Sequence, residues 1–412
     1  MSPNSESAKP CRVLWIFRNF HPELAGGAER FRRYSPGLIS RGVHVDVLTA
    51  SAHDLVEDDS PVPRVFRIPR PQASPAKIDH LLVKHAARLV HESGFAHQSV
   101  QVGVVHWPDV PYFLWLKAHG VRIILICTII QAVEQKKRSL FRSAFRWLTG
   151  VVTSRICDTI IVSSACMAES RVQEGAIHDQ IKVISNGVDT LRFRPRCAEE
   201  KKMLRARLGI PDQALVLLYM GGIVPRKRIH LLIEALHHLL VTHPSARLYL
   251  IGPTQRPTMF HAQDQDELLS YQARLYELAG GLINRSIFFS GETKEPETWF
   301  SVADVFVFCP INEGFGNVII ESMSAATPVV MTQFIGLADE LGVAGKHYLL
   351  ADDSGESLAD ACRHLFDDEG VRHRLVEDAL SWVHKKHSRD LTLDQLAAIY
   401  QGQEDAITDS TF

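Results

Sequence analysis

The stretch DVFVFCPINEGFGNVIIESMSAATPVVMT, residues 304–332, decides the fold of this chain. It contains an apolar run typical of a strand, a glycine-containing bend, a run with apolar residues at helical spacing, and a second strand-like run. Two strands joined by a helix form the parallel pair from which α/β sheets are built. Glu313 and Glu321 flank the bend, eight positions apart. The bend therefore carries two carboxylates where sheets of this kind bind ligands.

The same alternation runs through most of the 412 residues. In the first half we expect strands at 12–17, 44–49, 102–106, 122–128 and 159–164, with helices such as 28–40 and 109–119 between them. In the second half we expect strands at 214–222, 246–252, 286–291 and 304–310, with helices at 229–243 and 266–279. Parallel sheets covered by helices on both faces follow from this spacing. The length suggests two domains of roughly 200 residues, so the predicted fold class is α/β with two Rossmann-like domains.

The composition excludes several classes of protein. The formal net charge of −2 argues against a nucleic-acid partner, since nucleic-acid binders are usually basic. The seven cysteines are widely spaced without a CxxC pair, which predicts a reduced, cytoplasmic protein. The first ten residues are polar and unlike a signal peptide, and no apolar run reaches the ~18 residues that span a bilayer. No cluster of His, Asp and Glu has metal-ligand spacing, so we expect no metal and no cofactor.

The bend in residues 312–322 has the features of a phosphate site. Gly314 and Gly316 allow the backbone to approach a ligand closely, and the amides of Asn317 and Val318 are first-turn donors of the next helix. Glu321, one turn later, is placed to accept hydrogen bonds from a vicinal diol, and Glu313 to hold sugar hydroxyls. The alternative is two solvated carboxylates favoured by the helix dipole.

Four segments in this order resemble the retaining glycosyltransferases of family 4, which have the GT-B fold. They are HPELAGGAERF (21–31), VISNGVDTLRFRP (183–195), MGGIVPRKRIHLLIEAL (220–236) and Glu-x7-Glu followed by Thr-Pro-Val-Val (313–330). The resemblance implies two Rossmann-like domains that face each other across a cleft. With it, we expect a disordered tail at 1–10, an acceptor domain at 11–190, a donor domain at 191–386 and a helix at 387–412 that crosses back to the first domain.

The resemblance also implies roles for particular residues. Lys227 matches the lysine that binds the donor's β-phosphate, and with Glu313 it forms the expected catalytic pair. The family usually has an arginine where this chain has Gly222, and Arg226 and Arg228 are candidates to replace it. The expected donor-binding residues are Glu321, Gly314, Phe315, Gly316, Asn317, Val318, Gly222, Arg226, Arg228, Gly291, Glu292, Gly26 and Gly27; Gly291 and Glu292 lie in the loop that usually contacts the nucleobase.

The acceptor side is less well marked. Many members of the family have a histidine two positions after the threonine that follows the strand at 122–128, where this chain has Ile130. Gln131, His21 and His106 are candidates for contacts with a sugar or an acceptor, and packing or surface roles are the alternative for each. Asp109 either orients an acceptor hydroxyl or caps the next helix.

Residues 135–156 form a basic amphipathic segment. The apolar stripe consists of Leu140, Phe141, Ala144, Phe145, Leu148, Val151 and Val152, and its basic border of Lys136, Lys137, Arg138, Arg142 and Arg146. Such a helix either rests on an anionic membrane surface or packs into the core with a solvated basic face.

The expected activity is the transfer of a hexosyl-type unit from a nucleotide-diphosphate sugar to a hydroxyl acceptor, with retention of anomeric configuration. UDP is the default nucleotide because it is the commonest in the family. Two alternatives stay open on the same fold. One is a phosphorylase or nucleotide-sugar epimerase. The other is a catalytically silent sugar-nucleotide binder, which the absent histidine and Gly222 would favour.

Overall fold

The computed structural model describes residues 11–20, 26–51, 63–92, 97–127, 140–254 and 262–404. The chain divides into two compact units. The first comprises residues 1–185 and 390–412, and the second comprises residues 186–389. The helix α13 (Arg389–Tyr400) therefore belongs to the first unit, except for its first residue, although it lies near the end of the described chain.

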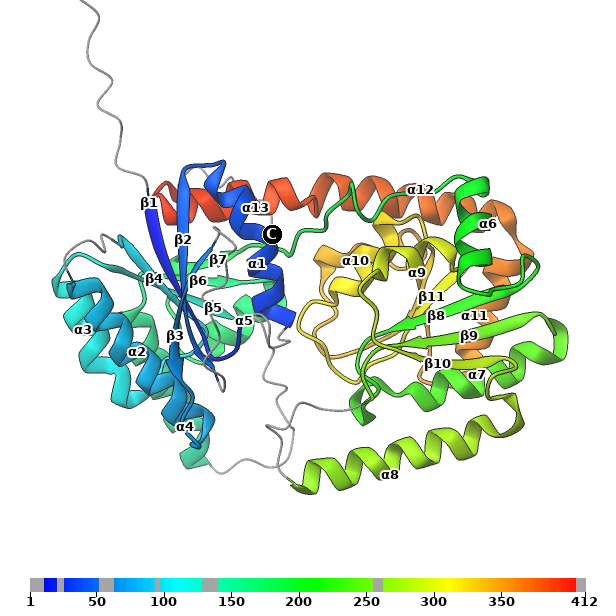
Figure 1. Ribbon diagram of the computed structural model, residues 1–412, viewed down its shortest axis with the longest axis horizontal. Coiled ribbons are helices and arrows are strands. Elements are labelled where there is room, and N and C mark those ends of the chain that lie inside the picture. Colours follow the sequence, from blue (N-terminus) through cyan, green and yellow to red (C-terminus); the bar gives the residue numbers. More distant parts are fainter. Residues whose placement is uncertain are drawn as a thin grey trace, which may run out of the picture. The chain divides into compact units, whose positions relative to one another are not determined.

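The first unit is built on a parallel sheet in the order β3-β2-β1-β4-β5-β6-β7, counted over the described residues (Figure 1). Its strands are β1 (Cys11–Phe17), β2 (Val43–Ser51), β3 (Arg64–Pro69), β4 (Ser99–Val102), β5 (Arg122–Cys127), β6 (Thr159–Val162) and β7 (Ile181–Val183). The helices are α1 (Gly26–Ile39), α2 (Pro75–His91), α3 (Val110–Ala118), α4 (Leu140–Ile156), α5 (Ala165–Gln173) and α13, with short 3-10 turns η1 (Trp107–Asp109) and η2 (His178–Gln180).

Alternate residues of each strand face opposite layers of helices. Leu14 and Ile16 of β1 join a buried cluster with residues of α2, α3 and α5. Val13 and Trp15 join a second cluster with α1 and α13, where Trp15 Nε1 donates to Tyr400 Oη at 3.2 Å. The period-2 pattern thus buries both faces of the sheet, as a parallel sheet requires.

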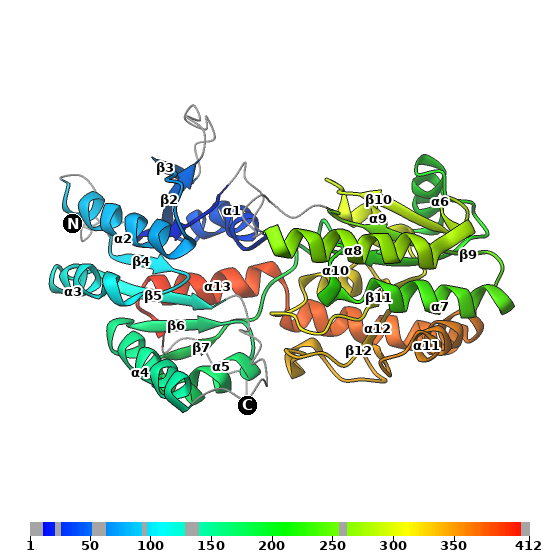
Figure 2. The same ribbon diagram turned by 90° about the horizontal axis from the view of Figure 1, so that it is seen from below.

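The second unit repeats this architecture with the order β10-β9-β8-β11-β12-β13. Figure 2 shows β9, β10, β11 and β12 of this sheet together with α7 and α8. Its strands are β8 (Leu215–Met220), β9 (Ala246–Ile251), β10 (Ile287–Gly291), β11 (Val305–Phe308), β12 (Val329–Thr332) and β13 (Leu349–Ala351). The helices are α6 (Ala198–Arg207), α7 (Ile229–Thr242), α8 (Ala262–Ala279), α9 (Pro296–Val302), α10 (Asn317–Ser324), α11 (Gly355–Asp367) and α12 (Glu369–Lys386), with turns η3 (Pro225–Lys227), η4 (Gly280–Leu282) and η5 (Asp339–Leu341). Helix α7 packs against α8 and α11, and α10 against α9 and α12.

One expected strand lies elsewhere. We predicted a strand at 102–106, but β4 is Ser99–Val102, and Gly103 to His106 have no strand structure. The buried strand contains Ser99 and Gln101, which are polar, whereas the more apolar run that follows leads into η1. The Gln101 side chain accepts a hydrogen bond from the Tyr400 hydroxyl, which accounts for a polar residue in a buried strand.

Each sheet has a point where the strand order reverses. In the first unit β1 lies between β2 and β4, and in the second β8 lies between β9 and β11. Ligands of open α/β sheets bind outside the carboxyl ends of the strands at such points. The loops after β1 and β4, and those after β8 and β11, are therefore the expected ligand-binding loops.

Candidate functional site

In the second unit the switch point brings Lys227 and Glu313 together. Lys227 ends η3, which follows β8, and Glu313 lies in the loop after β11, the neighbouring strand. The two loops are joined through their backbones, because Ile311 N donates to Arg226 O at 2.8 Å. The strand order of the sheet thus brings the two predicted catalytic residues, 86 positions apart in the chain, into one site.

Glu313 is the centre of a three-residue charge cluster. Its Oε2 accepts from Lys227 Nζ in a short contact and from Arg226 Nη1 at 3.2 Å. The Lys227 side chain is 9% exposed and its ammonium lies 4.7 Å from the centre of the Phe308 ring. Arg226 is 46% exposed and also donates to Asn312 O at 3.1 Å. The cluster carries a net positive charge when all three groups are ionised, which suits an anionic ligand.

Burial and pairing act against each other on these groups. Burial lowers the pKa of Lys227, although the Glu313 carboxylate acts in the opposite direction. Burial alone would raise the pKa of Glu313, but Lys227 and Arg226 outweigh it, so this pKa lies below its ordinary value. Glu313 is accordingly a carboxylate at neutral pH and is matched by two cations.

The bend after Glu313 leads directly into α10. Gly316 caps this helix at φ 80°, and a Cβ at that position would lie 2.8 Å from Ile319 Cδ1, so the turn requires glycine. The amides of Asn317 and Val318 open the first turn of α10 and have no acceptor within the helix, whereas Ile319 N donates to Gly316 O at 2.8 Å. Asn317 Oδ1 accepts from Asn186 Nδ2 at 2.6 Å, which fixes the start of the helix to the segment that opens the unit. A helix N-terminus, a feature that suits an anion, therefore lies directly after the loop of Glu313.

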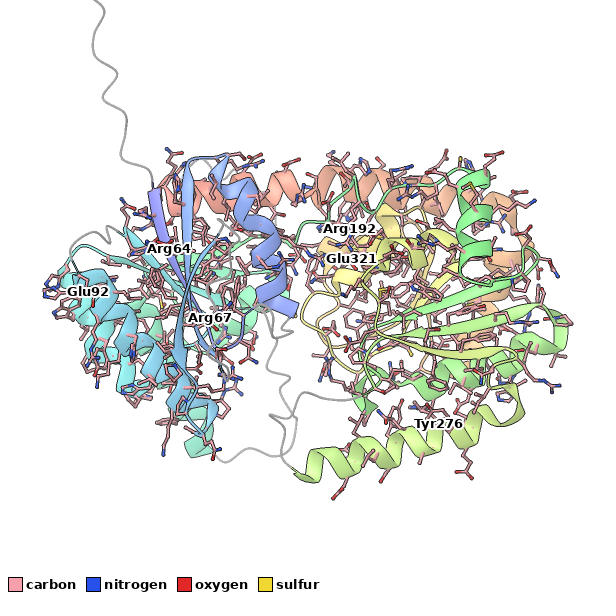
Figure 3. The ribbon with its side chains drawn as sticks, viewed as in Figure 1. Arg64, Arg67, Glu92, Arg192, Tyr276 and Glu321 are labelled. Carbon is pink, nitrogen blue, oxygen red and sulfur yellow. The ribbon has the colours of Figure 1, made fainter. Side chains whose placement is uncertain are left out.

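Other predicted donor-binding residues have different surroundings. Phe315 is 3% exposed and its ring lies 5.5 Å from that of His387, so its side chain belongs to the core and anchors the bend. Val318 packs against the same core. Glu321 is half-buried on α10, one turn after the bend (Figure 3). Gly314 is adjacent to the Glu313 carboxylate, with its amide 3.4 Å from Oε1.

Arg226 and Arg228 are the candidates to replace the arginine that the family usually has at the position of Gly222, and the structure distinguishes between them. Arg228 does not reach outward as a phosphate ligand, because its guanidinium bonds to Cys309 O, Pro310 O and Thr332 Oγ1. A Cβ at Gly222 would lie 3.9 Å from Val224 Cγ1, its nearest neighbour, so this position has room for a side chain. Arg226 is thus the remaining candidate for a second cation.

The loop after β10 contains the residues predicted to contact a base. Gly291 ends the strand at φ 69° and its carbonyl accepts from Gly252 N at 2.7 Å. Glu292 is exposed, and Thr293 Oγ1 accepts from Glu295 N. A Cβ at Gly252 would lie 2.0 Å from Gly221 O, so the ends of β8 and β9 approach each other as only glycine permits.

In the first unit, the switch point contains a second charged cluster. Asp79 of α2 accepts from Arg18 Nε at 3.0 Å and Nη2 at 2.6 Å, and its Oδ2 lies 3.2 Å from His106 Nε2. Asp109, fully buried, lies 2.7 Å from His80 Nδ1 and accepts from the His106 amide at 3.2 Å. The loops after β1 and β4 are thereby joined through α2.

The contacts in this cluster favour the protonated, charged form of His106 and the ionised form of Asp79. The hydrogen bond to Asp79 raises the pKa of His106, with burial acting against it. Burial would raise the pKa of Asp79, but His106 and Arg18 hold it below its ordinary value. His106 and Asp109 are among the residues that we expect on the acceptor side, whereas no local pattern groups them with Asp79 and His80. Arg18 was identifiable only as the residue directly after a predicted strand.

Some expected site residues are not placed by the structure. His21 and Gln131 lie outside the described residues. Gly26 and Gly27 open α1, as a glycine-rich loop before a helix would. Across the described ranges no group of three or more His, Cys, Asp or Glu side chains has metal-binding geometry, and no helix is long and apolar enough to cross a membrane. All seven cysteines are free thiols.

Helix α4 exposes part of its predicted apolar stripe. The exposed fractions are 52% for Phe145 and 45% for Leu148, and the neighbouring Trp147 is 55% exposed. Trp107, in the turn after β4, is 42% exposed, and its ring centre lies 6.3 Å from that of Phe145. Val151 and Val152 are half-buried and Ile156 is buried, so the second half of the helix packs as a core helix does.

Comparison with known proteins gave two family models that together span most of the chain. Residues 200–382 match the model described as glycosyl transferases group 1, and residues 25–192 match glycosyltransferase family 4. An uncharacterised glycosyltransferase of Methanocaldococcus jannaschii is 25% identical over 406 residues, which is 95% of this chain and 98% of that protein.

Two further relatives carry more specific names. A D-inositol 3-phosphate glycosyltransferase of Streptomyces bingchenggensis is 30% identical over 274 residues, 64% of this chain and 58% of its own length, so the match leaves a large part of that protein uncovered. The structure of Anabaena HepE in complex with UDP and glucose superposes with a TM-score of 0.73 at 17% identity, over 95% of this chain and all of that chain. This last likeness is one of fold.

Proposed function

We propose that this chain, which belongs to the group 1 glycosyltransferases of family 4 and has the GT-B fold, transfers a hexosyl-type unit from a nucleotide-diphosphate sugar to a hydroxyl acceptor with retention of configuration. The observation that carries the proposal is the pairing of the buried Lys227 with the half-buried Glu313 beside the N-terminus of α10. UDP is the proposed nucleotide, in keeping with the UDP bound in the Anabaena relative.

In the proposed reaction, the bond between the anomeric carbon and the β-phosphate oxygen breaks while the acceptor oxygen bonds to the same carbon. The acceptor's proton passes to the departing diphosphate, so no enzyme nucleophile is required. Negative charge grows on that diphosphate. Lys227 and the free amides of α10 are fixed donors for it, and preorganised donors of this kind often contribute the largest part of catalysis.

Glu313 has two parts in this scheme. Without donor it pairs with Lys227 and Arg226 and offsets one of their two positive charges, and with donor its second oxygen is available to a sugar hydroxyl. Arg226, being half-exposed, can follow the phosphate as it leaves. Glu321 is proposed to hold the ribose diol from its place on α10. In this scheme no metal is needed, because the site supplies its own positive charge.

The test is a donor panel. Purified protein is mixed with UDP-, GDP-, ADP- and TDP-sugars, and thermal stability and release of free nucleotide are followed. A donor at a hundred times its dissociation constant stabilises the protein by about 2.7 kcal/mol. We expect one donor to stabilise the protein and to be hydrolysed slowly, and Glu321→Ala to weaken its binding. Binding without any turnover would favour a silent binder, and turnover with inorganic phosphate would favour a phosphorylase.

We further propose that the enzyme contacts an anionic membrane surface through α4. Residues 135–156 contain six basic and no acidic residues, and the exposed Phe145, Trp147 and Leu148 lie within them. Aromatic rings beside basic residues are typical of helices that lie in the headgroup region. Arg146 is paired with Glu174, so the remaining basic residues provide most of the attraction.

Vesicle sedimentation tests this contact. We expect binding to vesicles that contain phosphatidylglycerol, weaker binding to pure phosphatidylcholine, and a loss on raising the salt concentration. Phe145→Ala combined with Trp147→Ala is expected to abolish it. Leu191→Ala removes a side chain that is 81% exposed in the second unit and serves as the control. Equal binding of both variants would contradict the assignment to α4.

A further inference from the structure

Arg228 has an unusual backbone conformation next to the donor site. It links η3 to α7 at φ 51° and ψ 41°, in the left-handed region that residues with a side chain rarely adopt. In the described part of the chain only Asn284 and Ala326 share this property among residues other than glycine. Residues held in such conformations are kept there by their surroundings and are common at functional sites.

The groups that bind the Arg228 side chain form those surroundings. This side chain is 14% exposed, and each guanidinium nitrogen has a partner in the protein. Nε donates to Cys309 O at 2.7 Å, Nη2 to Pro310 O at 3.1 Å and to Thr332 Oγ1 at 2.8 Å. Nη1 lies 2.8 Å from Asp353 Oδ2. With its donors engaged in this way, Arg228 is not built to bind a phosphate itself.

These partners lie at the ends of adjacent strands. Cys309 and Pro310 follow β11 and begin the loop that carries Glu313, and Thr332 ends β12. Arg228 itself directly follows Lys227. One planar guanidinium therefore connects the loop of Lys227 to the loop of Glu313 through two backbone carbonyls. The hydrogen bond from Ile311 N to Arg226 O is the backbone part of the same connection.

We propose that Arg228 is a positioning residue for the donor site, setting the register between the two loops and hence the geometry of Lys227 and Glu313. The left-handed backbone turns the Arg228 side chain toward the ends of β11 and β12, while Lys227 stays in the site. This inference rests on the proposed function, because Arg228 is assigned a role in shaping the site for the proposed donor. A lysine at position 228 cannot make the same set of contacts, because a single ammonium does not reach the two backbone carbonyls and the Thr332 hydroxyl as the planar guanidinium does.

The test compares Arg228→Gly with Asn284→Gly. Both variants place glycine where φ is positive, 51° and 57°, so both relieve backbone strain and are expected to fold. Asn284 is exposed in the turn before β10 and is not part of the donor site. For Arg228→Gly we expect the donor dissociation constant to rise at least about tenfold and kcat to fall by about a hundredfold, as small displacements at reacting groups do. Asn284→Gly is expected to match the wild type.

Hydrogen exchange at the Ile311 amide provides a readout that needs no donor. We expect exchange at this amide to be faster in Arg228→Gly than in the wild type, and Arg228→Lys to lie between them in both exchange and donor affinity. Unchanged exchange, or a lower Tm with unchanged donor affinity and kcat, would overturn the positioning role. If the wild type itself binds no sugar nucleotide, the proposed function fails first, and the donor role of Arg228 with it.

Discussion

Replacing Lys227 by methionine removes one charge from the donor site and keeps most of the side-chain volume. The methionine can still lie against the Phe308 ring, which the lysine ammonium approaches to 4.7 Å. Glu313 loses its buried partner but keeps Arg226, whose Nη1 lies 3.2 Å from its Oε2. The substitution therefore separates the charge of Lys227 from its contribution to packing.

The cost in stability can be bounded from these contacts. Removing one partner of a fully buried ion pair costs about 3–5 kcal/mol, because the other charge is left unpaired. Here the Glu313 side chain is 22% exposed and retains one cation, so we expect a loss of about 2 kcal/mol. For a unit of this size that corresponds to a fall in Tm of roughly 4–8 °C. The variant should stay folded at 25 °C.

The cost in catalysis is larger. A single preorganised donor to developing charge contributes a factor of about 10²–10³ to kcat. We expect Lys227→Met to lower kcat for donor hydrolysis or transfer by that factor, and the donor KM to change by less than about tenfold, since charge on the leaving diphosphate grows mainly in the transition state. Lys227→Arg is expected to restore part of kcat.

The assay is steady-state release of nucleoside diphosphate from the donor that the panel identifies, with Tm measured on the same samples. Glu313→Gln serves as the companion variant, since a double-mutant cycle isolates the coupling within the pair. If Lys227→Met changed kcat by less than threefold while donor binding stayed intact, Lys227 would not face the leaving phosphate and the reasoning from its position would be refuted.

Three further predictions concern other parts of the two sites. Because the pKa of His106 is raised in the fold, its pairing with Asp79 adds stability that is complete below about pH 6.5, the unperturbed value, and is lost as pH rises through the folded pKa. The difference in unfolding free energy between wild type and His106→Gln should therefore shrink from pH 5.5 to 8.5; parallel profiles would contradict this. Gly316→Ala is expected to destabilise the protein by about 1–2 kcal/mol in denaturant titrations and to weaken donor binding, because φ is 80° and the Cβ meets Ile319. Gly222→Arg, where the structure leaves space, is expected to tighten donor binding severalfold in calorimetric titrations; weaker binding would show that this position does not face the phosphates.

The α/β class was predictable because both periodicities are strong in this chain. Runs such as residues 215–220 and 229–242 are long and uniform enough to identify a buried strand and an amphipathic helix. The strand β4 was misplaced because its buried polar residue, Gln101, is satisfied by Tyr400, almost 300 positions away. A local pattern carries no information about such a partner.

The same distinction separates the predicted from the unpredicted parts of the site. Glu313 and the bend were found because glycines, a strand and a helix lie within one short stretch. The pairing of Glu313 with Lys227 depends on β8 and β11 being neighbours, and the pairing of Asp79 with Arg18 on where α2 packs. The direction of the Arg228 side chain, toward the ends of β11 and β12, depends on a positive φ angle at this residue. Residues other than glycine rarely adopt such an angle, so the sequence does not predict it.

The most direct test of the proposed activity is proton NMR of the sugar product. The wild-type enzyme is incubated with the donor found in the panel, and the anomeric signal of the first product formed is recorded before mutarotation, together with free nucleoside diphosphate. We expect both to appear together, the product to have the donor's anomeric configuration, and Lys227→Met to suppress both signals. An inverted product would contradict the proposed mechanism, and an unchanged donor with every nucleotide tested would contradict the assignment of the Lys227–Glu313 site.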